Sequence, residues 1–353
     1  MRQNEKFSNA LIMWYLINKR DLPWRKTKDP YLIWLSEIIL QQTRIAQGTS
    51  YYEKFADKFK DVFALADSDE KTILKMWQGL GYYSRARNLH STAREIVAAY
   101  NGKFPDNYKS LIKLKGIGDY TASAIASMAF DKGHAVVDGN VYRVLSRVFG
   151  IDTPINESKG VKEFKILAQE LLNLEDPGTH NQALMEFGAV VCTPKSPSCS
   201  SCVFNNRCEA LRTGRVDELP VKKKALKIKS RFFNFLVLND KNENTFIRQR
   251  IHKDIWQNLF EFPLLETSEE LYDTSDLLTF IEKEFNFTGT FHIKKFNQIP
   301  VVHKLSHQTL YTTFWIVHSE SIMENGMSWE QLNDYALPVL IQNFVDKYKG
   351  LNP

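Results

Sequence analysis

The chain has 353 residues, of which 43% are hydrophobic and 12% aromatic, and it carries a formal net charge of +5 with a pI near 8.8. This length and composition exclude an intrinsically disordered protein and favour two domains over one. Residues 1–20 hold only a short apolar run interrupted by polar and charged side chains, so they fit neither a signal peptide nor a membrane span. We therefore expect a protein of the reducing cytoplasm with no membrane partner. The basic excess suits a polyanionic partner without requiring one.

The N-terminal part of the chain, up to about residue 208, has apolar residues mostly at helical spacing, separated by Pro, Gly, Asn and Asp. Asp29 followed by Pro30 predicts an N-cap and a first helical position, and the apolar pattern after them predicts a helix that extends to Ile45. We expect a mostly α-helical domain over residues 1–215.

A glycine turn divides the segment Leu111–Ala129. Gly116-Ile117-Gly118 stands between the end of one helix and the start of a helix rich in small residues, which predicts a helix–hairpin–helix at about residues 109–128. Glycines free backbone N–H groups to point outward, and the following helix N-terminus adds partial positive charge, so the turn can seat a phosphate. An ordinary turn between two helices is the alternative that this pattern leaves open.

The cysteines of the chain fall in one short stretch. All four, Cys192, Cys199, Cys202 and Cys208, form the pattern C-x6-C-x2-C-x5-C. Four thiolates converging on one point can hold zinc or an iron–sulfur cluster, and the spacing alone does not choose between them. A disulfide framework fits poorly, because such frameworks belong to small, cysteine-dense secreted chains.

The C-terminal third has a different pattern. A basic run, VKKKALKIKSR at 221–231, precedes it, and we interpret residues 216–230 as a linker. Residues 231–353 mix strand-like and helical patterns, which predicts an α+β domain. RFFNFLVLND and NTFIRQR flank a polar turn and predict a hairpin. Further strands are expected near 291–296 and 310–317, and helices near 277–284 and 337–348.

The order of the helix–hairpin–helix, Asp138 and the cysteine loop resembles the DNA base-excision glycosylases of the endonuclease III superfamily, over about residues 7–212. Within that superfamily, LPWR at 22–25, WLSEIILQQT at 34–43 and GLGYYSRARNLH at 79–90 most resemble the MutY-type adenine DNA glycosylases, which remove adenine misincorporated opposite 8-oxoguanine. The resemblance implies a [4Fe-4S] cluster on the four cysteines and base flipping from double-stranded DNA that contains A:8-oxoguanine or A:G mispairs. It also implies a monomer that works at the bacterial nucleoid.

Two carboxylates in unlike surroundings would suit this chemistry. Breaking the N-glycosidic bond to adenine needs an acid to protonate the base and a negative group to support the oxocarbenium sugar. Glu37 has apolar neighbours that favour its neutral form if it is buried, and Asp138 stands at a predicted helix start that favours its ionised form. By resemblance, Glu37 protonates adenine and Asp138 stabilises or attacks the sugar cation, with Tyr120 and Asn140 as hydrogen-bonding partners. Without the resemblance, an exposed glutamate on a helix face and a plain N-cap would account for both residues.

Position 120 distinguishes two reaction types. Relatives that also cut the DNA strand carry a lysine there, because an amine forms a Schiff base with the sugar. Tyr120 cannot form that imine, so we expect a monofunctional glycosylase that leaves an abasic site.

The resemblance assigns further residues to the DNA, although helix surface and core packing would also account for them. The adenine pocket would contain Trp24, Arg25 and Gln182. The lesion and its backbone would be contacted by Leu40, Gln41, Gln42, Thr43, Tyr82, Gly116 and Gly118. The phosphates would also meet Arg85, Arg87, Lys113 and Lys115.

WQNLFEFP at 256–263 and the flanking strands resemble the Nudix-like domain that follows the linker in MutY-type enzymes. The predicted helix near 277–284 lacks the dense glutamates that hold magnesium in a working Nudix hydrolase, so we expect no nucleotide hydrolysis. Leu305-Ser306-His307 stands where the family has Phe-Ser-His. We expect Ser306 and His307 to contact the damaged guanine, and the leucine leaves an aromatic contact in doubt.

Two other functions fit parts of the sequence. A thymine or uracil mismatch glycosylase can also carry tyrosine at the position of Tyr120. A non-catalytic iron–sulfur DNA-binding protein would keep the hairpin and the cysteines, but it would have no use for both carboxylates.

Overall fold

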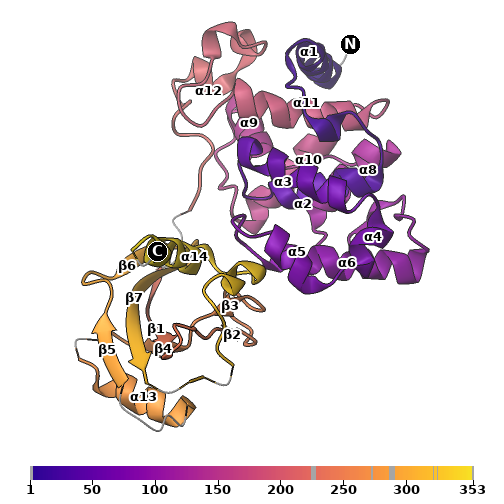
Figure 1. Ribbon diagram of the computed structural model, residues 1–353. Coiled ribbons are helices and arrows are strands. Elements are labelled where there is room, and N and C mark those ends of the chain that lie inside the picture. Colours follow the sequence, from indigo (N-terminus) through magenta and orange to yellow (C-terminus); the bar gives the residue numbers. More distant parts are fainter. Residues whose placement is uncertain are drawn as a thin grey trace. The chain divides into compact units, whose positions relative to one another are not determined.

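The computed structural model describes residues 3–223, 228–271, 273–285, 291–320, 322–323 and 325–351, which form two compact units (Figure 1). The first unit contains Met1–Ser68 and Arg87–Lys224. The second contains Asp69–Ala86 and Ala225–Pro353. The assignment of Asp69–Ala86 to the C-terminal unit is not visible in the sequence, because nothing in its local pattern shows which partner it packs against. Among the described residues, no helix is both long and apolar enough to cross a bilayer.

The first unit is helical, as predicted. Its α-helices are α1 (Gln3–Asn18), α2 (Pro30–Leu40), α3 (Ile45–Lys58), α4 (Val62–Asp67), α6 (Ser84–Tyr100, which begins in the second unit), α7 (Tyr108–Leu111), α8 (Asp119–Phe130), α9 (Gly139–Phe149), α10 (Ser158–Leu171), α11 (Pro177–Val190) and α12 (Glu209–Arg212). Short 3-10 turns are η1 (Pro23–Arg25), η2 (Cys199–Ser201) and η3 (Asn205–Arg207).

Aspartate caps and prolines explain several of these helix starts. Asp29 accepts a hydrogen bond from the Tyr31 amide at the start of α2, with Pro30 at the first helical position, as predicted. The predicted extension of that helix to Ile45 is wrong, since α2 ends at Leu40 and Ile45 begins α3. The break begins at Gln41, whose ψ of 119° leaves the helix, and Gln42 follows with a left-handed φ of 57°.

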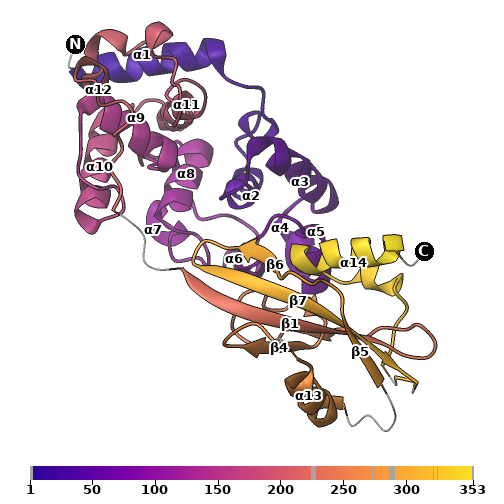
Figure 2. The same ribbon diagram turned by 90° about the vertical axis from the view of Figure 1, so that its left-hand side faces the viewer.

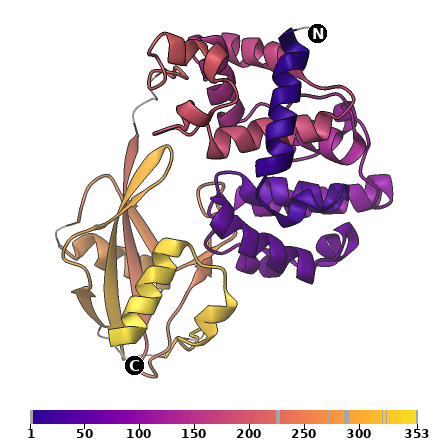
Figure 3. The ribbon, with the colours of Figure 1, turned by 90° about the horizontal axis from the view of Figure 1, so that it is seen from above.

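Packing of α1 onto helices from much later in the chain closes one hydrophobic core of this unit. Phe7 on α1 stacks on Phe204 of the cysteine loop, and Trp14 meets Phe187 of α11 edge to face. Figure 3 shows α1, at the N-terminus, lying across these later helices. The cysteine loop is thereby joined to the same core that carries α9 and α11.

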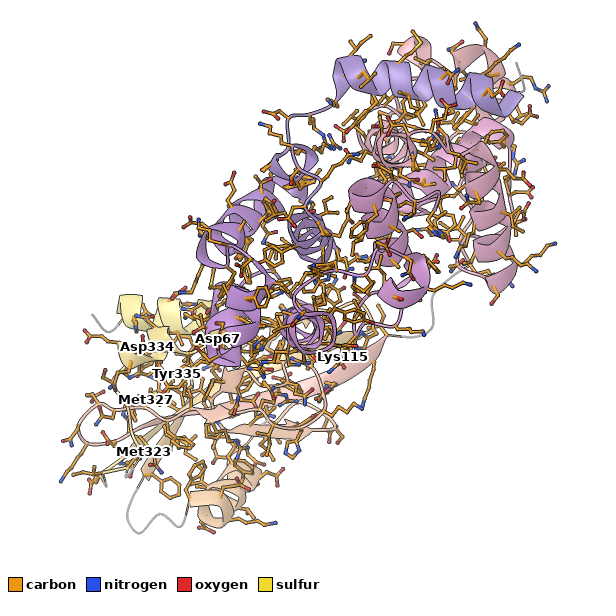
Figure 4. All side chains as sticks on the ribbon, turned by 90° about the vertical axis from the view of Figure 1, so that its right-hand side faces the viewer. Asp67, Lys115, Met323, Met327, Asp334 and Tyr335 are labelled. Atoms are coloured by element: carbon orange, nitrogen blue, oxygen red, sulfur yellow. The ribbon has the colours of Figure 1, made fainter. Side chains whose placement is uncertain are left out.

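The predicted helix–hairpin–helix is present as α7, a turn and α8. Gly116 has a φ of 76°, and a Cβ at this position would lie 2.6 Å from the Cβ of Asn88, so only glycine fits here. Gly118 is extended and precedes the first residue of α8. Lys115, labelled in Figure 4, adjoins this turn, and its carbonyl accepts a hydrogen bond from the Thr92 hydroxyl of α6.

The second unit is built on a mixed sheet with strand order β4-β1-β7-β5, and β6 also pairs with β7. Its strands are β1 (Lys229–Asn239), β4 (Leu264–Thr267), β5 (Phe291–Lys295), β6 (Val301–Lys304) and β7 (Gln308–Ser319). A second, two-stranded sheet joins β2 (Arg248–Gln249) to β3 (Phe260–Glu261). Its remaining helices are α5 (Glu70–Met76), α13 (Ser275–Phe285), η4 (Gln331–Asp334) and α14 (Val339–Leu351).

Helices α14 and α13 cover opposite faces of the larger sheet (Figure 2). Side chains alternate along a strand, so Phe235 and Val237 of β1 face the core of α14, whereas Leu236 and Leu238 face the core of α13. The predicted strands near 291–296 and 310–317 and both predicted helices are confirmed as β5, β7, α13 and α14.

The predicted hairpin between RFFNFLVLND and NTFIRQR is wrong. β1 pairs in parallel with β7 along its whole length, from Lys229 opposite Gln308 to Asn239 opposite His318. Of the expected hairpin, only an isolated bridge between Asn239 and Thr245 is present. The end of the basic run predicted as a linker, from Lys229 onward, belongs to β1, and residues 224–227 of the run lie outside the described residues.

Segment Asp69–Ala86 is fixed within the second unit by several polar contacts. The Lys75 Nζ donates to the carbonyl of Tyr335 at 2.9 Å, and the Lys71 Nζ lies 4.1 Å from the Tyr335 ring centroid. Tyr335 is labelled in Figure 4, just after η4. Asn258 donates to Glu70 at 2.6 Å. Tyr82 therefore belongs structurally to the unit that carries Ser306.

Candidate active site

Glu37 lies on α2 among buried residues and is itself only 9% exposed. Burial raises the pKa of its carboxyl from 4.5 to about 7, because a charge is poorly solvated there. The negative charge of Asp138 contributes to this rise, while a hydrogen bond from Tyr120 and the charge of Arg25 oppose it. The two predicted carboxylates therefore lie near enough to interact, and Glu37 can carry a transferable proton near neutral pH.

Asp138 is the N-cap of α9, as predicted. Its carboxylate accepts hydrogen bonds from the Val141 amide and from Asn140 Nδ2, each at 2.8 Å. Burial raises the pKa of Asp138 above its ordinary value, and these hydrogen bonds and the charge of Arg143 oppose that rise. The sequence suggested the cap, but it gave no sign of the burial.

Tyr120, on α8, interacts with both acids. Its hydroxyl hydrogen-bonds the carboxyl of Glu37 and also lies 3.4 Å from the Met185 sulfur. Burial and the nearby charges of Glu37 and Asp138 raise the pKa of Tyr120 well above its ordinary value, so it remains a neutral phenol. It can donate a hydrogen bond, but it cannot act as a base at neutral pH.

The predicted adenine-pocket residues come from two regions of the chain. Trp24 and Arg25 lie on η1, with the Trp24 ring 5.3 Å from that of Tyr52, edge to face. Gln182 lies on α11, where its Oε1 accepts a hydrogen bond of 2.6 Å from the Tyr15 hydroxyl. The amide nitrogen of Gln182 is therefore the end left to donate.

Glu186, one turn after Gln182, is a site residue that the sequence reading missed. Its carboxylate accepts hydrogen bonds from Arg20 at 2.6 Å and from Arg25 at 2.7 Å, while its side chain is 1% exposed. Burial would raise the pKa of Glu186, but the hydrogen bonds from Arg20 and Arg25 outweigh it and hold the pKa at about 2. Glu186 thus fixes Arg25, whose charge also acts on Glu37. The only sequence signal is the i, i+4 spacing from Gln182.

The residues predicted to reach the lesion occupy the end of α2. Leu40 is its last residue, and Gln41, Gln42 and Thr43 follow in a turn closed by the Thr43 amide on the Leu40 carbonyl. Gln41 contacts the Thr121 hydroxyl at 3.3 Å. A left-handed φ at a glutamine is uncommon, and such backbone strain is found preferentially at functional sites.

In the second unit, the structure brings Tyr82 and Ser306 together. The Tyr82 hydroxyl and the Ser306 Oγ share a short hydrogen bond, and Tyr82 has a left-handed φ of 47°. Ser306 and His307 form the tip of the turn between β6 and β7, closed by the Leu305 amide on the Gln308 carbonyl at 2.8 Å. Both are exposed, whereas Arg85 is buried over the Trp77 ring, and its contact with a phosphate stays a prediction.

The four cysteines line one small hollow, together with Arg147, Phe187 and Leu211. None of them forms a disulfide. In the described part of the chain, no three His, Cys, Asp or Glu residues are placed to hold a single metal ion. Burial raises the pKa of Cys202 to about 11, so a positive centre is needed to keep its thiolate there. Four thiols that line one hollow are the donor set that an iron–sulfur cluster or zinc would use.

Arg143 connects this hollow to the acids. Its guanidinium donates to the Asn140 side chain at 2.8 Å and to the main-chain carbonyl of Cys192 at 2.6 Å. It also donates to the Gly188 carbonyl. A Cβ on residue 188 would lie 2.9 Å from the main-chain oxygen of Asn140. Glycine at 188 lets α11 approach α9 closely enough for these contacts.

Buried carboxyls of raised pKa beside a helix–hairpin–helix and a four-cysteine hollow define a base-excision DNA glycosylase. A family model described as the HhH-GPD superfamily of base excision DNA repair proteins matches residues 35–170, and a NUDIX domain model matches residues 234–347. The adenine DNA glycosylase of Buchnera aphidicola subsp. Baizongia pistaciae is 35% identical over 98% of this chain and 97% of its own length. That of Homo sapiens is 40% identical over 60% of this chain and 41% of its own. A solved thermostable thymine-DNA glycosylase is 32% identical, covering 60% of this chain and 97% of its own, with a TM-score of 0.56.

The chain belongs to the adenine DNA glycosylase family. It is an N-glycosyl hydrolase of base-excision repair that acts on DNA, and the predicted family, fold class and enzyme class are confirmed.

Proposed function

We propose that this glycosylase releases adenine opposite 8-oxoguanine or guanine, with Glu37 as the acid and Asp138 as the anion beside the sugar. The raised pKa of Glu37, about 7, carries this proposal, because an acid is most useful when its pKa lies near the working pH. Protonation makes the leaving adenine less anionic. The Asp138 carboxylate, oriented by Asn140 and the α9 amides, supports the oxocarbenium sugar or attacks it.

The adenine edge would meet Gln182, Arg25 and Trp24. The Gln182 amide nitrogen can donate to N7 of adenine, since its oxygen is held by Tyr15. Arg25 is held in place by Glu186 rather than free to rotate. A pocket of fixed groups discriminates among bases better than a flexible one.

Reaction ends at an abasic site. Tyr120 carries no amine for a Schiff base, and its hydroxyl is committed to hydrogen bonding with Glu37. Leu40, Gln41, Gln42 and Thr43 would fill the gap left by the flipped nucleotide, and the Gly116 to Gly118 turn would seat a phosphate.

Recognition of the opposite base would rest on Tyr82, Ser306 and His307. 8-Oxoguanine differs from guanine in carrying a hydrogen on N7 and an oxygen on C8. A protein group at N7 must therefore accept a hydrogen bond from 8-oxoguanine, whereas it must donate one to guanine. A serine hydroxyl can fill that role, and the hydrogen bond between Tyr82 and Ser306 fixes its orientation. A binding rather than a hydrolytic role suits this Nudix-like domain, because α13 carries only two glutamates, and one of them, Glu284, pairs with Arg248 at 2.8 Å.

The four cysteines would hold a [4Fe-4S] cluster. The hollow, its thiol donors and its buried cation Arg147 suit a group that carries net negative charge once four thiolates bind it. When bound, the cluster would fix the loop that connects α11 to α12. We also propose that the protein works as a monomer at the nucleoid in the bacterial cytoplasm.

Single-turnover release from duplexes containing A:8-oxoguanine, A:G, A:T, T:G and U:G tests the substrate assignment. We expect fastest release from A:8-oxoguanine, slower release from A:G and little from A:T. Borohydride should trap no enzyme–DNA adduct. Release of thymine or uracil without adenine would replace the proposal by the mismatch activity of the thymine-DNA glycosylase that shares this fold.

A further inference from the structure

Arg147 is a buried cation on α9 that faces the cysteine hollow. It is 2% exposed and lines the hollow with all four cysteines. Its Nη1 lies 3.5 Å from the Cys192 sulfur. Its remaining contacts are with the main-chain carbonyls of Thr193, Pro194 and Leu219.

This charge has no carboxylate partner. Within the described ranges, no Asp or Glu forms an ion pair with Arg147. A buried guanidinium that meets only neutral groups is strongly disfavoured. Arg143, on the same helix, is also buried, whereas the arginines after Cys202 in the loop are paired or exposed. Arg212, for example, pairs with Glu209 and is 72% exposed. Within the described residues, the Cys192 thiol contacts the Arg147 side chain and, once ionised, would supply negative charge there.

We infer that Arg147 is the charge partner of the cysteine-bound cluster and sets its reduction potential. This inference rests on the proposed cluster. Four thiolates give such a cluster a net negative charge, and each added electron makes it more negative. A fixed cation in contact with a ligand sulfur therefore stabilises the reduced form more than the oxidised form. Because Arg147 is 2% exposed, this attraction is only weakly screened.

Shape and charge can be separated with two variants. Arg147→Lys keeps the positive charge but loses the planar fork that binds three carbonyls. Arg147→Gln removes the charge and keeps a donor. Arg212→Gln makes the same chemical change on an exposed residue of α12, four positions after Cys208, and serves as the matched control.

The full-length proteins are purified without oxygen, their iron and acid-labile sulfide are measured per chain, and the potential of the cluster is measured by voltammetry. For Arg147→Gln we expect at least a tenfold fall in the equilibrium constant for one-electron reduction, which is a potential lower by 59 mV. Arg147→Lys should stay within threefold of the parent protein, and Arg212→Gln should match it. Failure of Arg147→Gln alone to retain iron, with Arg147→Lys loaded, also supports the inference.

Other outcomes overturn it. A loaded Arg147→Gln protein with an unchanged potential would show that the charge is not felt by the cluster. Loss of iron from both Arg147 variants would assign Arg147 to loop shape alone. Parent protein that contains zinc or no iron would instead refute the proposed cluster, and that result is separate from any difference among the variants.

Discussion

Replacing Glu37 by glutamine should stabilise the protein while it removes the acid. Glutamine has nearly the same shape and can keep a hydrogen bond to Tyr120, but it carries no titratable proton. Between the unfolded pKa of 4.5 and the folded value of about 7, the folded state retains a proton that the unfolded chain has released. Through Glu37, the free energy of unfolding of the parent protein therefore falls as pH rises through that window, and it no longer changes above it.

The size of this effect follows from the shift. One pKa unit corresponds to about 1.36 kcal/mol, so the burial of Glu37 costs about 3 kcal/mol above pH 7. Part of that cost is already present at pH 5.5, because the unfolded chain has begun to ionise there. The advantage of Glu37→Gln over the parent should therefore grow by about 2 kcal/mol between pH 5.5 and pH 8.5.

Chemical denaturation at the two pH values measures this, with unfolding of the helical unit followed by tryptophan fluorescence and circular dichroism. Glu95→Gln, at an exposed position of α6, is the control and should show no such growth. An advantage for Glu37→Gln that is the same at both pH values would refute the assignment of a raised pKa to Glu37.

Three further variants probe the surroundings of the site. Tyr120→Phe removes a hydrogen bond that lowers the pKa of Glu37, so the alkaline limit of excision should move to higher pH in a rate profile. Glu186→Gln leaves Arg25 without its buried partner; denaturation should show a loss of roughly 3 kcal/mol, and excision should slow. Ser306→Ala removes the partner of the Tyr82 hydroxyl and should reduce the ratio of the rates on A:8-oxoguanine and A:G without affecting the rate on A:G. Equal ratios in parent and variant would count against a role in lesion reading.

Much of the fold could be predicted because its signals are local. Caps such as Asp29 and Asp138 and the Gly116 turn act within a few residues, and the structure keeps all three. The end of α2 was missed because Gln41 and then Gln42 leave the helical conformation within a continuous apolar pattern. The partner of β1 was missed because β7 lies far along the chain, and the alternation of side chains does not say which strand is the neighbour.

The candidate site also combines residues that local sequence predicts with residues that only the folded chain reveals. Glu37 and Asp138 could be proposed from an apolar context and a helix start, but their mutual influence on pKa depends on how α2 packs against α8 and α9. Glu186 had only its spacing from Gln182 as a signal and Arg147 had none, since their partners are Arg25 and a cysteine loop that only the folded chain brings near. Burial decides the chemistry of all four side chains, and burial is a property of the packed unit.

The dependence of single-turnover adenine release on pH tests the central claim most directly. Rates on an A:8-oxoguanine duplex, measured from pH 5.5 to 9 at fixed ionic strength, should fall about tenfold per pH unit above an apparent pKa near 7. The small remaining rate of the Glu37→Gln variant should not show this fall above pH 7. A parent rate that stays level from pH 6 to 9, or a variant that keeps the same fall, would contradict the role of Glu37 as the acid.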